Sequence, residues 1–306
     1  MASSALLSTW TTCAALPPID PELEEQPITQ KHAKIGAYQL TRKLGVGEFA
    51  NVYECIKREE AANRATAKKY AFKAIKKARV QRHAQLHKAK RNIKRVDTEV
   101  ASMKKLSHGA VVRLYDVIQS PSMLYIVLEK GDRDLYSFLD SHEYADGCPD
   151  DVVKSVMRIA ALGLRHCHAH GVAHRDLKPE NILVVGQPGD WSLLEENDDP
   201  CKRGVVKLCD FGLCADVSSG ENLTDFVGSP CFFAPEILLD GSYDGRAADV
   251  WSLGCVMLEM LLGHAAFSQV WCPPYDQLKN DDKFRSAIHV AVQEVKAGCT
   301  ECTPSP

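Results

Sequence analysis

Hydrophobic and polar positions follow a strand-like pattern over the first part of the chain. Five short stretches mix β-branched, aromatic and polar residues, and Gly-containing, Pro-containing or charged turns separate most of them. These stretches are residues 38–44, 51–57, 70–76, 111–118 and 123–128. The pattern predicts a small β-sheet in this part of the chain.

A helical pattern interrupts these strands and then dominates the rest of the chain. Residues 80–106 contain no Gly or Pro, and they place Val96, Val100 and Met103 at helical spacing. After Gly131, three further helices are expected, at residues 135–141, 151–170 and 250–262. A small β-rich half followed by a larger helical half predicts an α+β, two-lobed fold.

Charge is unevenly distributed along the 306 residues. The net charge is only −3, but residues 31–105 carry 21 Lys and Arg against 6 Asp and Glu, while the remainder carries 16 against 34. A basic first part and an acidic second part suggest different partners for the two lobes, and the basic part suits an anionic ligand.

The cysteines and the chain start bear on location. The 12 cysteines are irregularly spaced and no secretory segment precedes them, so we expect reduced thiols in the cytoplasm or the nucleus. The apolar stretch 250–267 contains Glu259 and His264, which favours a buried helix over a membrane span. Residues 1–37 contain four prolines and an acidic patch, and we expect a disordered leader there.

A glycine-rich turn between two predicted strands is the first candidate for chemistry. Glycines at 45 and 47 would let the backbone approach phosphate groups closely. The strand–turn–strand setting argues against a dinucleotide fold, in which a helix follows the strand. By itself the turn is explained about as well by a plain hairpin.

The second candidate is Lys73, on a predicted strand, together with Glu99 on the following helix. Taken by itself, Lys73 is best explained as a solvent-exposed lysine at the edge of a strand. Glu99 lies on the predicted buried face of its helix, however, and a buried carboxylate needs a partner.

The segment 174–181, His-Arg-Asp-Leu-Lys-Pro-Glu-Asn, decides between these interpretations. Asp210-Phe211-Gly212 follows it along the chain. A carboxylate, a lysine and an amide at fixed offsets can orient a hydroxyl, balance phosphate charge and bind a metal. Chance agreement at so many positions is negligible.

With these motifs the chain resembles the eukaryotic protein kinase family. The resemblance implies a bilobal kinase domain over residues 38–300, with an N-lobe at 38–128, a hinge at 129–131 and a C-lobe at 132–300. It also implies that the chain uses ATP and Mg²⁺ and phosphorylates a protein substrate.

The resemblance also implies roles for single residues. Lys73 would hold the ATP phosphates and pair with Glu99, Asp176 would accept the substrate proton, and Asn181 and Asp210 would bind Mg²⁺. Residues implied to contact the nucleotide are Leu44, Gly45, Val46, Gly47, Glu48, Phe49, Val52, Ala71, Glu129, Gly131, Asp134 and Leu183.

The branch of the family is indicated by Lys178 and Ser229. Lys178 is typical of serine/threonine kinases, and Ser229 resembles the hydroxyl that bonds to the catalytic Asp and Lys in that branch. The Tyr-Ala-Phe-Lys strand at 70–73 also suggests the calmodulin-dependent and related group.

Regulation leaves two hypotheses open. Asp225 stands where the family often has a phosphorylated threonine, so it could offer a standing negative charge to Arg175. Alternatively, the neighbouring Thr224 is phosphorylated as usual after a one-residue shift.

Three features depart from the family. Residues 186–204 are expected to be an inserted surface loop, and 301–306 a tail. The chain after Phe267 is short, so the C-lobe looks truncated, and Glu236 lacks the family's arginine partner; Arg285 is the available substitute. A nucleotide-binding, pseudokinase-like scaffold is the alternative function that this departure suggests.

A basic helix at residues 76–95 is the last feature. It is explained either as a solvated face or as a docking patch for an acidic activator. No aromatic residues are interleaved with its charges, so nucleic acid is not an expected partner.

Overall fold

The structure is a computed structural model that divides into two compact units, Met1–Gly131 and Asp132–Pro306. We call these the N-terminal and the C-terminal unit. The residues that the structure describes are 10–23, 33–47, 50–81, 86–140, 144–186, 201, 204–278 and 281–300.

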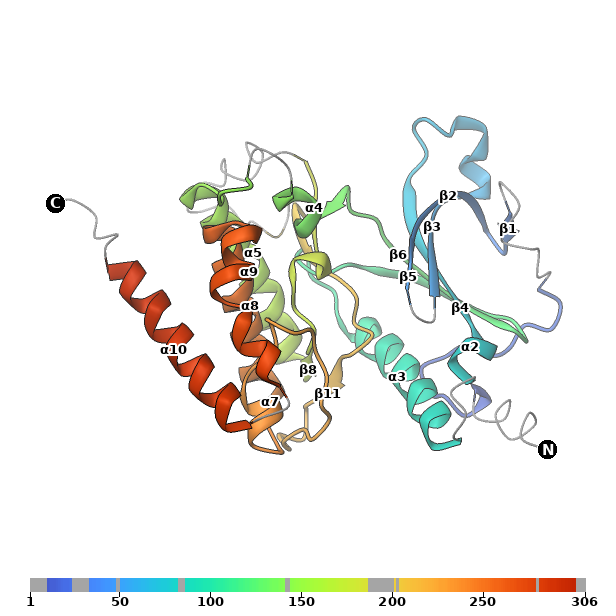
Figure 1. Cartoon of the computed structure of the whole chain (residues 1–306). Coiled ribbons are helices and arrows are strands. Elements are labelled where there is room, and N and C mark those ends of the chain that lie inside the picture. The colour runs from blue at the N-terminus through green and yellow to red at the C-terminus, as the bar shows by residue number, and fades with distance from the viewer. Residues whose placement is uncertain are drawn as a thin grey trace. The chain divides into compact units, whose positions relative to one another are not determined.

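The N-terminal unit is built on a six-stranded antiparallel sheet in the order β1-β2-β3-β4-β6-β5. Figure 1 labels these strands. Its elements are β1 (Lys34–Ile35), β2 (Tyr38–Val46), β3 (Ala50–Lys57), η1 (Arg58–Asn63), β4 (Lys69–Lys76), α2 (Lys77–Gln81), α3 (Leu86–Lys105), β5 (Leu114–Gln119) and β6 (Met123–Glu129). The predicted strands are all present. The predicted helix 80–106 appears as α2 and α3, and residues 82–85 lie outside the described residues.

Both faces of this sheet are buried, because successive side chains of a strand point to opposite faces. On one face, Tyr38, Phe72 and Tyr125 form a cluster of aromatic rings. On the other, Leu124 and Ile126 belong to the core cluster that includes the apolar face of α3. The apolar face of α3 therefore packs on this face of the sheet, and the packing fixes the distance between α3 and strands β4 and β6.

The N-terminal segment corrects one prediction. Residues 1–37 were expected to be disordered, but within them residues 10–23 are packed against the sheet and α3. Trp10 is only 1 % exposed and belongs to the same core cluster as α3. The prediction rested on the prolines and did not weigh Trp10. Burial of this large aromatic side chain and the hydrogen bonds of the segment together oppose the entropy cost of ordering it.

The C-terminal unit is mainly helical (Figure 1), and α5 packs against α8. Its elements are β7 (Arg133–Asp134), α4 (Leu135–Leu139), α5 (Asp150–Ala169), β8 (Val172–Ala173), η2 (Pro179–Asn181), β9 (Ile182–Val184), β10 (Val206–Leu208), β11 (Ala215–Asp216), α7 (Glu236–Leu239), α8 (Gly245–Leu262), α9 (His264–Val270), η4 (Pro273–Gln277) and α10 (Asp281–Thr300). Of the expected insertion 186–204, only Gly186, Cys201 and Gly204 are described.

The last helix, α10, belongs to the core of this unit. Phe284 is fully buried, and its ring contacts those of Phe233 and Tyr275. Arg285 lies 3.6 Å from Asp240, and no described residue forms an ion pair with Glu236. The proposed pairing of Arg285 with Glu236 is therefore wrong, and packing by α10 is what stabilises this end of the unit. Residues 301–306, the expected tail, lie outside the described residues.

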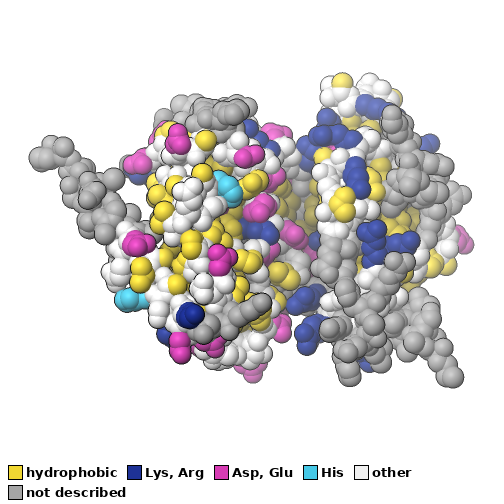
Figure 2. Space-filling model, viewed as in Figure 1, with side chains coloured by type: hydrophobic (Ala, Val, Ile, Leu, Met, Phe, Trp, Pro, Cys, Tyr) yellow, Lys and Arg dark blue, Asp and Glu magenta, His cyan; other side chains and the backbone are white. Residues whose placement is uncertain are grey.

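Surface charge differs between the two units, as the sequence indicates. Figure 2 shows Lys and Arg side chains on the visible face of the N-terminal unit, and Asp and Glu side chains spread over that of the C-terminal unit. Within the described part of the chain, no helix is both long and apolar enough to cross a lipid bilayer.

The buried ring of Phe284 gives a stability prediction. Phe284→Ala should lower the free energy of unfolding by about 3 to 5 kcal/mol, because it leaves a cavity among aromatic rings. Val290 on the same helix is 54 % exposed, so Val290→Ala should change it by less than about 0.5 kcal/mol. Urea unfolding followed by circular dichroism measures both variants. Equal effects would show that α10 is not part of the core.

Candidate active site

The segment that carries Asp176 is fixed by one buried carboxylate. Asp249 of α8 is fully buried and accepts hydrogen bonds from the backbone N–H groups of His174 and Arg175, at 2.8 and 2.6 Å. The His168 ring lies 2.8 Å from the same carboxylate. Three donors satisfy a charge that would otherwise be costly to bury, and the loop between β8 and η2 is held against α8.

Arg175 adopts a backbone conformation that non-glycine residues seldom adopt, with φ at 67°. Its side chain is 5 % exposed, and its Nε donates to the carbonyl of Leu213 at 2.7 Å. The two backbone bonds to Asp249 and this side-chain bond offset the strain.

Asp176 is the centre of a hydrogen-bond network. Its Oδ1 accepts the Ser229 hydroxyl at 2.8 Å, and its Oδ2 accepts the Asn181 amide at 3.0 Å. Lys178 donates to the Ser229 hydroxyl at 2.8 Å, and its Nζ lies 3.6 Å from Asp176. The structure thus brings together the four residues that the sequence proposed for Ser/Thr chemistry.

The side-chain oxygen of Asn181, Oδ1, is available to a ligand. Its Nδ2 donates to the Asp176 carbonyl at 2.7 Å as well as to the carboxylate, so the nitrogen end must face Asp176. The amide oxygen then points the other way, and it accepts no hydrogen bond from the described residues. Together with the exposed carboxylate of Asp210 it offers the oxygen ligands that Mg²⁺ prefers.

His174 links this network to the segment of Asp210. The Asp176 N–H lies 3.3 Å from His174 Nδ1, and Nε2 of the same ring lies 2.9 Å from the Cys209 carbonyl. This pairing assigns the hydrogen to Nε2, because Nδ1 must accept. The backbone at Asp210 is itself unusual, with φ at 57°. The buried His174 ring therefore joins the backbone of Asp176 to that of Cys209, the residue before Asp210.

In the N-terminal unit, Lys73 and Glu99 form the expected ion pair. Nζ and Oε1 are 2.6 Å apart, and the Glu99 side chain is 4 % exposed. Lys73 lies on β4 between Val52 of β3 and Ile126 of β6, so the sheet fixes its origin. The lysine is partly accessible, at 19 %, and can bind an anion while keeping its partner.

The glycine turn leaves open space above its backbone. A Cβ at Gly45 would meet no atom within 4 Å, and one at Gly47 would meet only the Ala50 carbonyl. Leu44 and Val46 beside them are 39 % and 68 % exposed. Glu48 and Phe49 were also predicted to contact the nucleotide, and they lie outside the described residues.

The remaining nucleotide-contact predictions rest on strand positions. Ala71 of β4 is opposite Leu128 of β6, and Glu129 ends β6. Gly131 is the last residue of the N-terminal unit, and Leu183 is opposite Asp134.

Asp134 has a clear structural role as the N-cap of α4. Its two oxygens accept the backbone N–H and the hydroxyl of Ser137, at 2.7 and 2.9 Å. A ribose contact by Asp134 stays a prediction.

Arg175 also lies close to the segment that contains Thr224, Asp225 and Ser229, which we call the activation segment. Its Nη1 lies 3.6 Å from Asp225 and 3.5 Å from the Tyr243 hydroxyl. Tyr243 in turn donates to the Asp225 carbonyl at 2.9 Å. Burial raises the pKa of Tyr243, and Arg175 beside it opposes that rise, so the phenol stays protonated and able to donate. The sequence did not identify Tyr243.

A disulfide lies next to this segment. Cys231, two residues after Ser229, is bonded to Cys272 at the start of η4. The expectation of reduced thiols is therefore wrong for this pair. Burial raises the pKa of the Cys167 and Cys255 thiols to about 12, which leaves these two thiols unreactive. Sequence spacing gave no signal for the pair, whose members are 41 positions apart along the chain.

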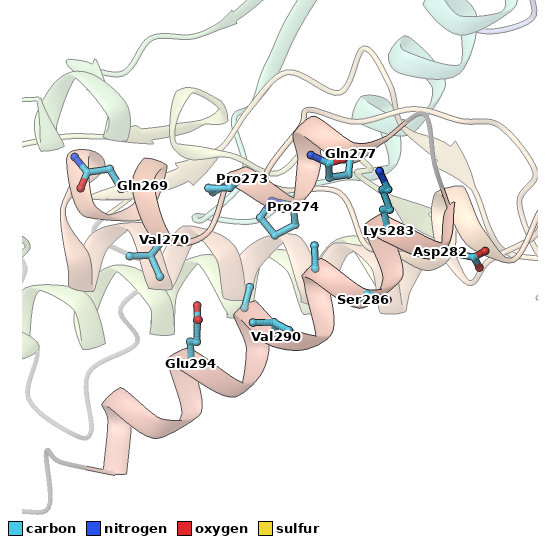
Figure 3. Close-up of a pocket in the computed structure, with 12 residues that line it drawn as sticks. Gln269, Val270, Pro273, Pro274, Gln277, Asp282, Lys283, Ser286, Val290 and Glu294 are labelled. Atoms are coloured by element: carbon cyan, nitrogen blue, oxygen red, sulfur yellow. The ribbon is translucent and has the colours of Figure 1, made fainter.

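A groove of about 850 Å³ lies elsewhere in the C-terminal unit, between α10 and the α9–η4 segment (Figure 3). Val270 and Val290 line it from opposite sides. It contains none of the residues proposed for catalysis or nucleotide binding, so it is separate from the candidate active site.

Comparison with known proteins identifies the family. A model of the protein kinase domain matches residues 38–296, which is most of the chain. The chain therefore belongs to the protein kinase family, and the assignment made from its motifs is confirmed. Protein kinases use ATP, and the Lys73 and glycine-turn geometry is consistent with that use.

The relatives with similar sequences are serine/threonine kinases. The chain is 32 % identical over 270 residues to an SNF-related serine/threonine-protein kinase of Rattus norvegicus, covering 87 % of this chain and 31 % of the relative. It is 33 % identical over 253 residues to CBL-interacting serine/threonine-protein kinase 24 of Arabidopsis thaliana, covering 80 % and 48 %. The chain thus spans about a third to a half of these relatives.

The Asp249 anchor can be tested directly. Asp249→Asn offers one acceptor oxygen to three donors, so it should lower the free energy of unfolding by about 3 kcal/mol. It should also speed hydrogen exchange in residues 172–181. Asp240→Asn is the control, because Asp240 pairs with Arg285 at the surface and should contribute less than about 1 kcal/mol. Similar effects of the two variants would refute the anchor.

Proposed function

We propose that this chain is an active serine/threonine protein kinase, which transfers the γ-phosphoryl group of ATP to a Ser or Thr hydroxyl of a protein substrate. The observation that carries the proposal is the Asp176 network. Lys178 and Ser229 both contact the group that would meet the substrate hydroxyl.

Asp176 is the proposed proton acceptor. Its carboxylate is held by Ser229 and Asn181 in one orientation, and a substrate hydroxyl placed beside it would donate its hydrogen to this group. Lys178 brings a positive charge close to the same point and would stabilise charge on the transferred phosphoryl group. Holding these groups in place before substrate arrives removes the cost of organising them during reaction.

The proposed cofactor sites follow from the charges available. Lys73, held by Glu99, is proposed to bind the ATP phosphates, with the backbone of Gly45 and Gly47 close to them. Asn181 and Asp210 are proposed to hold Mg²⁺, which would neutralise phosphate charge.

The proposal is tested by phosphate transfer from labelled ATP to a library of Ser- and Thr-containing peptides. Asp176→Asn removes the proton acceptor while keeping its size, and we expect at least about a 100-fold loss of transfer. Nucleotide affinity should be unchanged in this variant. Nucleotide binding by the unaltered chain without any transfer would overturn the enzyme proposal and leave a scaffold.

Asp225 is proposed to provide a standing charge for Arg175, so that activity does not require phosphorylation of the activation segment. The 3.6 Å approach to an almost fully buried guanidinium supports this role. Thr224 is exposed beside it.

Separate variants at 224 and 225 distinguish the two regulatory hypotheses. Asp225→Asn should lower transfer about fivefold, the factor that corresponds to the loss of about 1 kcal/mol of ion pairing. Thr224→Val should have little effect. If only the Thr224 variant lowers activity, phosphorylation at that threonine is the correct explanation.

A docking site for an acidic activator on residues 76–95 is a further proposal. Lys90, Arg91 and Lys94 of α3 are exposed, or nearly so, and point away from the core cluster. Their charge supports docking of an acidic segment, and salt would weaken such binding.

A further inference from the structure

The N-terminal segment places a tryptophan against the helix that carries Glu99. Trp10 is 1 % exposed and shares one core cluster with Ile93, Val96 and Val100 of α3. These three residues form the apolar face of the helix, and Glu99 lies directly before the last of them. Trp10 therefore belongs to the core cluster that includes the apolar residues of α3 next to Glu99 in the sequence.

Polar contacts fix the same segment along α3. The backbone N–H of Ala15 donates to Asp97 at 2.9 Å, and Lys104 donates to the Ala15 carbonyl at 2.6 Å. Asp97 and Lys104 lie on α3 on either side of Glu99. Ala15 thus contacts α3 at two positions, one before and one after Glu99 in the sequence. Its backbone N–H binds Asp97, and its carbonyl binds Lys104.

Two further contacts join the segment to β5 and to α2, which directly follows β4. The backbone N–H of Asp20 donates to the Gln119 carbonyl at the end of β5, at 2.8 Å. Lys77 lies with Nζ 5.3 Å from the centre of the Trp10 ring, and the same ammonium donates to the Ser120 carbonyl at 2.6 Å. The segment is therefore attached both to the helix and to the sheet beneath it, and it restrains one against the other.

We infer that residues 10–23 are a built-in brace for α3, with Trp10 as a positioning residue for the Lys73–Glu99 pair. The inference rests on the proposed function, because it assigns the brace a role in binding the ATP phosphates. The inferred role of Trp10 is indirect and involves no contact with ATP. Trp10 acts by keeping α3 at the position from which Glu99 reaches Lys73 across 2.6 Å.

Steady-state kinetics of the full chain separate positioning from mere stability. Trp10→Ala should raise the KM for ATP about tenfold at a temperature where the variant is fully folded, and Trp10→Phe should restore most of the loss. Tyr38→Ala is the matched control, since Tyr38 is 4 % exposed in the ring cluster on the opposite face of the sheet. It should lower the melting temperature without raising the KM. A Trp10 variant that loses only melting temperature would overturn the inference.

A second comparison asks whether Trp10 acts through Glu99. In a Glu99→Gln background, the change Trp10→Ala should raise the KM for ATP no further, because the interaction it supports is already lost. An equal, multiplicative increase in both backgrounds would contradict the inference.

Failure of the proposed function can be recognised separately. If the unaltered chain transfers no phosphate, the kinase proposal fails. The role of residues 10–23 as a brace is then tested by measuring ATP affinity and hydrogen exchange. Trp10→Ala should weaken ATP binding and speed exchange around residues 96–100 more than Tyr38→Ala does. Equal exchange in the two variants would refute the brace whether or not the chain is an enzyme.

Discussion

The buried carboxylate of Asp249 is the constraint on which the candidate active site depends. A charge without solvent must be satisfied by donors, and here two of the donors are successive backbone N–H groups, those of His174 and Arg175. Because Asp249 accepts hydrogen bonds from both groups, the path of the chain is fixed at this point. These bonds also offset the energetic cost of the left-handed backbone conformation at Arg175. Asp176 is the next residue along the chain, and Ser229 and Asn181 then hold its carboxylate.

A buried carboxylate also determines the geometry in the N-terminal unit, where it lies on a helix that packs against a sheet. Glu99 is buried on a helix, and Lys73 is its partner on a strand, so the pair forms only if helix and sheet keep a set separation. The core cluster provides that separation, and Trp10 extends the cluster with a residue from outside the sheet and helix. In both units a buried acid defines the geometry and an accessible group performs the proposed chemistry.

Sequence predicted the fold class, the five longer strands of the N-terminal sheet, the main helices up to α8, and the residues of the Asp176 network, because these depend on local pattern and on short, specific motifs. It failed where long-range packing decides. Trp10 was placed in a disordered leader because only a tertiary contact orders it. The pairing of Cys231 with Cys272 and the contact of Tyr243 with Asp225 depend on how distant segments meet, which spacing along the chain does not encode.

The most direct test is phosphate transfer by the unphosphorylated full chain. The protein is treated with phosphatase, shown by mass spectrometry to carry no phosphate, and assayed with labelled ATP, Mg²⁺ and a protein substrate for an initial rate. The account predicts immediate transfer to serine or threonine, because Asp176, Lys178 and Ser229 are already assembled and Asp225 already faces Arg175. ATP binding without transfer to any residue would contradict it.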